Sequence, residues 1–265
     1  MNLRVAVLID GSFFLKRLQF FKNTYYGSHP DLSAKDTTYI LNKIIYKHLQ
    51  SDNDKIFNYL YRSFFYDAEP YTKKGHYPLP KPGQQHRQAI DFGKEPTAIF
   101  RGELLEELKR QPKLALRLGS LKTNGEWVLK KQVLQQLLAN ERSFDSLTNQ
   151  DFSLDIRQKG VDIKLGIDIS TLSYQKLVDK IILIAGDTDF VPAAKLARTN
   201  GVEFVLDPLR NHIDESLHEH IDRLVNFDLV SILKEQLNVE PDVTPSWWST
   251  GAAPKKPKRT RNHTR

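Results

Sequence analysis

Two aspartates, Asp187 and Asp189, closely follow an apolar run at residues 181–185 that a glycine ends. The run is typical of a buried strand, and in an open α/β sheet ligands bind where such strands end. Two carboxylates beside an apolar strand are costly unless a positive charge lies between them, and a divalent cation is the usual candidate. The alternative is a solvated Asp-x-Asp turn that caps the next helix.

A second acid at the end of an apolar run favours the cation. Residues 3–9 form such a run, and Asp10 and Gly11 follow it. Two parallel strands that both end in aspartate place those acids side by side if the strands are neighbours. A third segment, residues 159–168, supplies two more acids, Asp162 and Asp168.

Composition limits the classes of protein. The chain has 265 residues and no cysteine, which excludes disulfides, thiolate metal sites and cysteine nucleophiles, so oxygen or imidazole must hold any metal. No apolar stretch approaches the ~20 residues of a membrane span, and residues 1–10 lack the features of a secretory signal. We therefore expect a cytoplasmic protein without a membrane partner.

The net charge of +7 is concentrated in one segment. Residues 251–265 carry six lysines and arginines and no acid, so the rest of the chain is close to neutral. This proline-containing tail has little to bury and is predicted to be disordered. Such a tail either adds affinity for phosphate backbones or only increases solubility.

The rest of the pattern alternates between strands and helices. Strands are expected at residues 3–9, 57–66, 113–121, 181–185 and 202–206, and helices at 37–50, 101–110, 130–140, 188–200 and 214–225. Residues 161–174 fit a strand by alternation and a helix by their apolar stripe. The alternation predicts a three-layer α/β/α fold with a mainly parallel central sheet.

Two segments interrupt this pattern, and a third follows it. Residues 68–98 contain five prolines and mix aromatic with basic residues, which suits a single-stranded nucleic acid or an ordinary polar loop. Residues 123–155 form an insertion. We place one domain at residues 1–238, and a linker with the basic tail at 239–265. Trp247 and Trp248 either dock on the domain or mark a partner site.

Three motifs in this order resemble a known family. They are Asp10-Gly11 after the first strand, Lys159-Gly160-Val161-Asp162 with Asp168 six residues on, and Gly186-Asp187-Thr188-Asp189-Phe190 after a buried strand. Together they are similar to the NYN domain, the LabA-like branch of the PIN-like nuclease superfamily, over roughly residues 3–230. The segments 61–68 and 116–122 also resemble that family's second and third strands.

The resemblance implies a PIN-like, Rossmann-like fold and metal-dependent cleavage of RNA, and it favours a helix at residues 161–174. In such a helix Asp162 lies at the start, whereas Asp168 lies about 9 Å along the axis and about 120° around it. We therefore favour Asp162 as a direct ligand. Asp168 remains a candidate for a second metal or an outer contact; the alternative is a buried acid paired with Lys159 or Lys164.

Phosphodiester hydrolysis needs a water made nucleophilic and stabilisation of the charge on phosphorus. One or two Mg²⁺ or Mn²⁺ ions can do both, and these ions take oxygen ligands. The predicted catalytic and metal-binding residues are Asp10, Asp162, Asp187 and Asp189, with Asp168 as a further metal candidate. Close carboxylates repel one another, so at least one should have a raised pKa without metal.

Ser12 and Lys159 are candidates for contact with the substrate. The alternative for Ser12 is a hydroxyl that only stabilises a turn, and the alternative for Lys159 is an ordinary surface lysine. Many relatives have asparagine three residues after the first aspartate, where this chain has Phe13.

The leading hypothesis is a metal-dependent endoribonuclease acting on single-stranded RNA, with single-stranded DNA as a further substrate. The alternative is a catalytically silent nucleic-acid-binding or regulatory module on the same fold. A homo-oligomer is left open. A phosphatase of the haloacid dehalogenase type is excluded because Ser12 stands where its second aspartate is needed.

Overall fold

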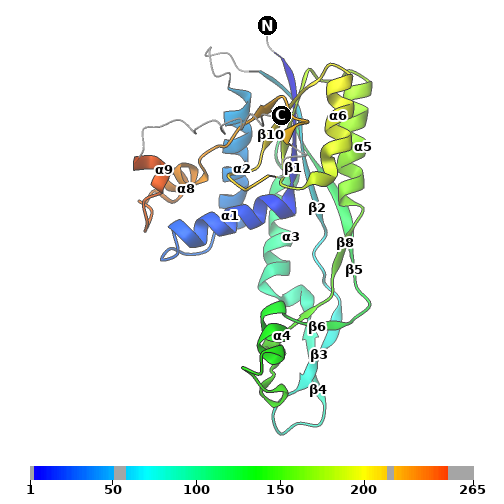
Figure 1. The fold of residues 1–265 in the computed structure, drawn as a ribbon, viewed down its shortest axis with the longest axis vertical. Coiled ribbons are helices and arrows are strands. Elements are labelled where there is room, and N and C mark those ends of the chain that lie inside the picture. The colour runs from blue at the N-terminus through cyan, green and yellow to red at the C-terminus, as the bar shows by residue number, and fades with distance from the viewer. Residues whose placement is uncertain (1–2, 51–57, 214–217, 250–265) are drawn as a thin grey trace, which may run out of the picture.

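A mainly parallel sheet forms the centre of the protein. The computed structural model describes residues 3–50, 58–213 and 218–249, and within them the sheet has the strand order β11-β10-β9-β1-β2-β5-β8 (Figure 1). Only β8 runs antiparallel to its neighbour. The strands are β1 (Arg4–Asp10), β2 (Tyr59–Ala68), β5 (Leu114–Lys122), β8 (Arg157–Lys159), β9 (Lys180–Ile184), β10 (Glu203–Asp207) and β11 (Arg223–Leu224).

Helices cover both faces of this sheet, which confirms the predicted three-layer α/β/α architecture. One face packs against four helices: α1 (Gly11–Tyr25), α2 (Ala34–Leu49), α3 (Pro96–Lys109) and α8 (Leu229–Leu237). The other face packs against α5 (Val161–Tyr174) and α6 (Val191–Thr199) (Figure 1).

Strand β1 explains why the molecule has two cores. Its side chains alternate across the sheet: Val5, Val7 and Ile9 join the first core, and Ala6 and Leu8 join the second. All five are fully buried. Parallel strands that are buried on both faces read as continuous apolar runs, which is why residues 3–9 lack polar alternation.

The carboxyl ends of three strands meet at the centre of one sheet edge. β1 lies between β2 and β9, with Asp10 opposite Tyr66 on one side and Ile9 opposite Ile184 on the other. The chain therefore leaves β1 towards one side for β2 and returns on the other side as β9. This reversal is the place where open α/β sheets bind ligands.

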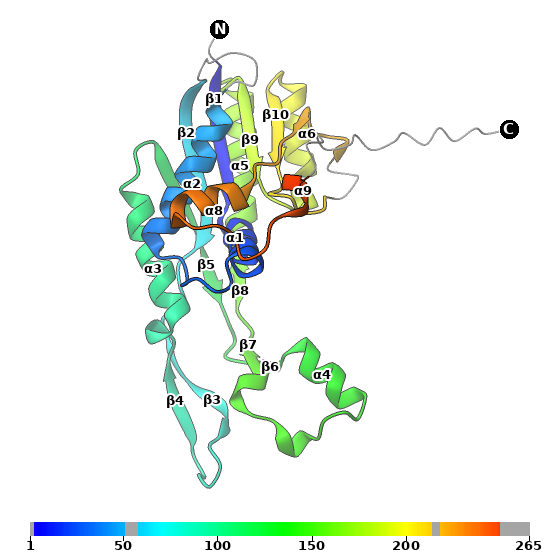
Figure 2. The same ribbon diagram turned by 90° about the vertical axis from the view of Figure 1, so that its left-hand side faces the viewer.

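The two segments that interrupt the α/β pattern form a single projection, which we call the arm. Residues 68–98 contain the antiparallel strands β3 (Lys74–Pro80) and β4 (Arg87–Asp91). Residues 123–155 contain β6 (Trp127–Leu129), α4 (Lys131–Leu138) and β7 (Phe152–Leu154). Figures 1 and 2 show both segments extending beyond the carboxyl edge of the sheet.

Specific contacts join the two segments of the arm. Asn149 bonds the backbone of Leu79 twice, accepting from its amide at 2.9 Å and donating to its carbonyl at 3.1 Å. The indole of Trp127 donates to the His76 carbonyl at 3.0 Å and stacks near the ring of Tyr77. From the sequence, residues 68–98 and 123–155 were predicted as two separate interruptions. In the structure they pack against each other.

The structure decides the predictions for residues 161–174 and for part of 214–225. Residues 161–174 form α5, because the stripe of Val161, Leu165 and Ile169 is buried while the alternating Ile163 and Ile167 are exposed. The helix predicted at 214–225 is wrong in its second half: Arg223–Leu224 pairs with β10 as strand β11, because backbone groups at the edge of β10 are available there. Residues 214–217 lie outside the described residues.

Helix α1 was not predicted. It begins directly after Asp10, whose side chain caps it. Helix α6 begins at Val191, after a 3₁₀ turn at Thr188–Phe190, and not at residue 188. None of the helices in the described part of the chain combines the length and apolar character needed to cross a bilayer.

The two C-terminal tryptophans pack against the domain. They lie on the short helix α9 (Ser246–Ser249), where the Trp247 ring meets Tyr25 at 5.6 Å and the Trp248 indole donates to Asp228. Residues up to this helix therefore contact the α/β body. The basic tail, residues 251–265, lies outside the described residues.

Candidate active site

Asp10 occupies the centre of the carboxyl edge. It is the last residue of β1 and the N-cap of α1, and its Oδ1 accepts the amide of Phe13 at 3.0 Å. Burial raises the pKa of the Asp10 carboxyl, and the charges of Asp162 and Asp67 raise it further, against the lowering effect of the backbone hydrogen bonds. The fold therefore holds a carboxylate where its charge is unfavourable.

Asp162 reaches the same edge from the far side of the sheet. It lies in the first turn of α5, directly after Gly160 and Val161. Gly160 has φ +80°, a conformation that glycine adopts without strain, and it turns the chain from β8 into the helix. Burial raises the pKa of Asp162, and the charges of Asp187 and Asp189 add to this shift.

Asp187 and Asp189 lie in the turn after β9. Both are exposed, and the Asp189 amide donates to Oδ1 of Asp187 at 3.1 Å. The turn packs against α1, since a Cβ on Gly186 would lie 2.5 Å from the ring of Phe13. Phe13 thus has a packing role at the position where many members of the family that this sequence resembles have asparagine.

The aspartates near the carboxyl ends of the sheet strands and in α5 fall into two groups. Those of the first group each form an ion pair with a basic side chain: Asp67 with Arg101, Asp168 with Arg117, and Asp207 with His48. Those of the second group form no ion pair with any basic side chain in the described residues: Asp10, Asp162, Asp187 and Asp189. We call the second group the four unpaired aspartates.

The donor chemistry of the four unpaired aspartates fits a hard divalent cation, which takes carboxylate oxygens. Their mutual repulsion, visible in the raised pKa of Asp10 and Asp162, is what such an ion would relieve. Across residues 3–50, 58–213 and 218–249, however, no three carboxylate or imidazole groups are near enough to one another to hold an ion as they stand. Coordination therefore requires side-chain movement.

Asp168 lies apart from this group. Its Oδ2 accepts the Tyr66 hydroxyl and the Nε of Arg117, both at 2.8 Å. The pKa of the Tyr66 phenol is raised by burial and by the Asp168 charge. The basic partner is Arg117, and not Lys159 or Lys164, the sequence-based candidates; Lys164 donates instead to the Leu118 carbonyl.

Asp67 was not among the predicted site residues. It is 2% exposed near the end of β2, accepts its neighbour Ala68's amide at 2.8 Å and forms an ion pair with Arg101 of α3. The available signal was an acid at the end of an aromatic strand, Tyr66-Asp67-Ala68. Arg101 gave no such signal, because only the packing of α3 brings it to β2.

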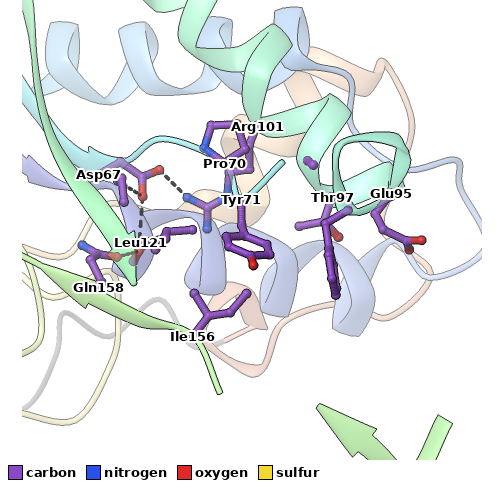
Figure 3. A pocket seen from close by; sticks show the side chains of 13 residues that line it. Asp67, Pro70, Tyr71, Glu95, Thr97, Arg101, Leu121, Ile156 and Gln158 are labelled. Atoms are coloured by element: carbon purple, nitrogen blue, oxygen red, sulfur yellow. Dashed lines mark hydrogen bonds and ion pairs between the residues drawn. The ribbon is translucent and has the colours of Figure 1, made fainter. Parts of the chain in front are cut away.

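Ser12 lies in the first turn of α1, and Lys159 is the last residue of β8. The Ser12 hydroxyl faces Oδ1 of Asp67 at 3.4 Å and Oε1 of Gln158 at 3.2 Å (Figure 3). A hydroxyl has one proton, so it donates to one of these acceptors at a time. Lys159 ends β8 beside Gly160, and its side chain is exposed.

A cavity of about 240 Å³ adjoins the acidic edge (Figure 3). Asp67 and Gln158 lie at one end, where the Ser12 hydroxyl faces both, and Tyr71 and Ile156 lie nearer its centre. The remaining wall comes from α3 and from the base of the arm. This cavity could not be predicted from the sequence, because its wall combines five separate segments of the chain.

The fold and this edge define a class: an α/β/α protein with unpaired acids where its central strands end. The family model of the NYN domain matches residues 102–226, a little under half of the chain. The match includes Asp162, Asp187 and Asp189. Asp10 lies outside it, on the central strand of the same sheet.

Three individual proteins were compared. An uncharacterised protein of Methanocaldococcus jannaschii is 27% identical over 82 residues, which are 31% of this chain and 34% of that protein. A protein of unknown function from Vibrio parahaemolyticus has a similar structure at TM-score 0.41 and 11% identity, covering 86% of this chain and 94% of its own. A structure described as "Sir2-p53 peptide-NAD+" has TM-score 0.33 and 12% identity, covering 89% and 93%. Both scores are too low to carry an inference.

Proposed function

We propose that the protein is a metal-dependent endoribonuclease that hydrolyses phosphodiester bonds in single-stranded RNA. The carrying observation is the contrast between the two groups of acids. Asp67, Asp168 and Asp207 each have a basic partner, whereas the charges of Asp187 and Asp189 act on Asp162, and that of Asp162 on Asp10, without one. A module that only binds a polyanion has no use for such a concentration of negative charge.

The four unpaired aspartates would hold Mg²⁺ or Mn²⁺. When bound, such an ion activates water and stabilises the charge that develops on phosphorus. Asp10 is the most fixed of the four, because it caps α1 and lies half-buried. Asp187 and Asp189 are exposed and free to adjust, and Asp162 completes the set from α5. Asp168 is left out of this proposal because Arg117 and Tyr66 already engage its carboxylate.

Two further residues would contact the substrate. Lys159 is exposed beside Gly160 and would meet a phosphate oxygen of the RNA. Ser12 donates its one proton to Asp67 or Gln158, so its oxygen lone pairs remain to accept a hydrogen bond from the substrate. The NYN domain match supports the nuclease class, and the acidic edge supports the choice of metal and of phosphodiester substrate.

The test uses the purified full chain with end-labelled single-stranded RNA and DNA of the same sequence, in Mn²⁺, Mg²⁺ or EDTA. We expect internal cleavage of RNA that EDTA abolishes. Asp187→Asn should reduce the rate by about 100-fold or more, the effect typical of losing one electrostatic contact to a transition state. Asp145→Asn, at an exposed aspartate of the arm, is the matched control and should cleave normally.

Two outcomes would contradict the proposal. Cleavage that survives both EDTA and Asp187→Asn would come from another site or a contaminant. RNA binding without cleavage in any metal would instead support the nucleic-acid-binding module on the same fold.

A further inference from the structure

We infer that the cavity beside Ser12 and Asp67 binds one unpaired nucleobase of the RNA, next to the bond that is cut. This inference rests on the proposed function, because it assigns the cavity to the same substrate. Its test, however, uses neutral nucleosides without metal, so it can succeed or fail independently of cleavage.

The position of the cavity connects it with the acidic edge. Ser12 lines it and lies two residues after Asp10, and the Ser12 hydroxyl faces Asp67, another lining residue, at 3.4 Å. A nucleotide whose phosphate lies at Asp10 therefore has its own or its neighbour's base within reach of this opening.

The lining matches a flat ring with polar edges. Tyr71 and Phe92 pack edge to face, with ring centroids 5.2 Å apart, and Ile156 and Leu121 supply further apolar surface. Stacking on an aromatic ring contributes about 1–3 kcal/mol per base and accepts any base. The volume of about 240 Å³ is below the range of drug-sized pockets, so it suits a single ring system and not a base pair.

Polar groups at one end provide hydrogen bonds to a base edge. Gln158 accepts from Ser12 through Oε1, while its amide nitrogen has no hydrogen-bond partner in the part of the chain that the structure describes. A carboxamide with a free N–H pair can donate to a ring nitrogen or a carbonyl oxygen of a base. Arg101 is held by Asp67 and serves as a wall and not as a free cation.

A second hollow continues from this cavity between the two segments of the arm. It measures about 880 Å³ and shares Phe92, Glu95 and Thr97 with the first, and Trp127 and Tyr77 lie along it. The next nucleotide of an unpaired strand would therefore meet further aromatic rings. A duplex could not enter, because its bases face each other. The cavity thus favours a single-stranded substrate over a duplex.

The decisive variant is Thr97→Trp. Thr97 is exposed in the first turn of α3 and lines both hollows, so an indole there fills the opening without changing the core. The matched control is Ile99→Trp on the same helix, since Ile99 is 49% exposed and lines neither hollow. Tyr71→Ala is a second variant, which removes the stacking ring instead of filling the space.

Adenosine, guanosine, cytidine, uridine and ribose are titrated into the full chain in EDTA and followed by saturation-transfer NMR. At least one nucleoside should bind with saturation strongest on base protons, and ribose should not bind. Thr97→Trp and Tyr71→Ala should weaken binding by about tenfold, as loss of one stacked base predicts, and Ile99→Trp should not.

Absence of nucleoside binding, or binding unchanged in both pocket variants, would overturn the inference even if RNA is cleaved normally. If nucleosides bind but RNA is not cleaved, only the proposed nuclease activity is refuted, and the inference about the cavity stands.

Discussion

The ring of Phe13 occupies the space that a side chain on Gly186 would need, since a Cβ there would lie 2.5 Å from the Cε2 atom of Phe13. Phe13 belongs to α1, which Asp10 caps, and Gly186 begins the turn that carries Asp187. This contact therefore positions the start of α1 and the turn after β9, which both border the acidic edge, relative to each other.

A double-mutant cycle tests this contact. Gly186→Ala should destabilise the protein because the new methyl group forces the ring to move, whereas the same change should cost much less in a Phe13→Ala background. The coupling free energy should be about 1–2 kcal/mol, measured from urea unfolding of the four proteins. Additive effects would mean that the ring moves aside freely and does not position the turn.

Asp10→Asn should make the protein more stable and less active. The folded-state pKa of Asp10 is raised, so above the ordinary value of 3.8 the folded protein binds more protons than the unfolded chain. Stability is therefore lost as the pH rises through the folded-state pKa. The amide removes this loss and still caps α1.

Calorimetry in EDTA should show a melting temperature a few degrees higher for Asp10→Asn at pH 7. The difference should shrink as the pH falls towards 3.8. Adding Mn²⁺ should raise the melting temperature of the natural protein more than that of the variant. A lower melting temperature for the variant at pH 7 would contradict the raised pKa of Asp10, because it would mean that the folded state favours the Asp10 carboxylate.

Asp168→Asn separates a structural acid from a catalytic one. It should lower the free energy of unfolding by roughly 1–3 kcal/mol, because Arg117 and Tyr66 lose a charged acceptor. Metal-dependent cleavage by the folded fraction should stay close to normal. The contrasting variant, Asp162→Asn, should cleave about 100-fold more slowly with no loss of stability. Equal losses of activity in the two variants would mean that Asp168 also acts as a metal ligand.

Arg101→Met should be more destabilising than the removal of both charges. The carboxylate of Asp67 is 2% exposed, so loss of its partner leaves a buried charge unpaired, at a cost of about 3 kcal/mol or more. Adding Asp67→Asn should recover much of that loss. Urea unfolding at pH 7 measures both proteins, and a double variant that is no more stable than Arg101→Met would show that the charge is not the cause.

The sequence was informative wherever a signal was local. Apolar runs located β1 and β9, and the acids directly after them located Asp10 and Asp187. The segment at 161–174 shows the limit of such reasoning, because its alternation and its helical stripe coexist. Only burial distinguishes them, and burial depends on how α5 packs on the sheet.

Features that depend on distant segments were not predictable from one sequence. The partners of Asp67 and Asp168 come from α3 and β5, and the cavity draws on five segments of the chain. The arm is a similar case, since its contact between Leu79 and Asn149 spans 70 positions. Whether an acid is paired or unpaired decides its role here, and pairing is a property of the fold.

The arm has a consequence for how such proteins diversify. Its two segments leave and rejoin the body near the carboxyl edge, after β2 and after β5, and contact mainly each other and the start of α3. Insertions, deletions or exchange of the arm would therefore leave the sheet and its acids intact. The length and lining of the path for a substrate can change separately from the chemistry, so two proteins with the same acidic edge and different arms would be expected to choose different substrates.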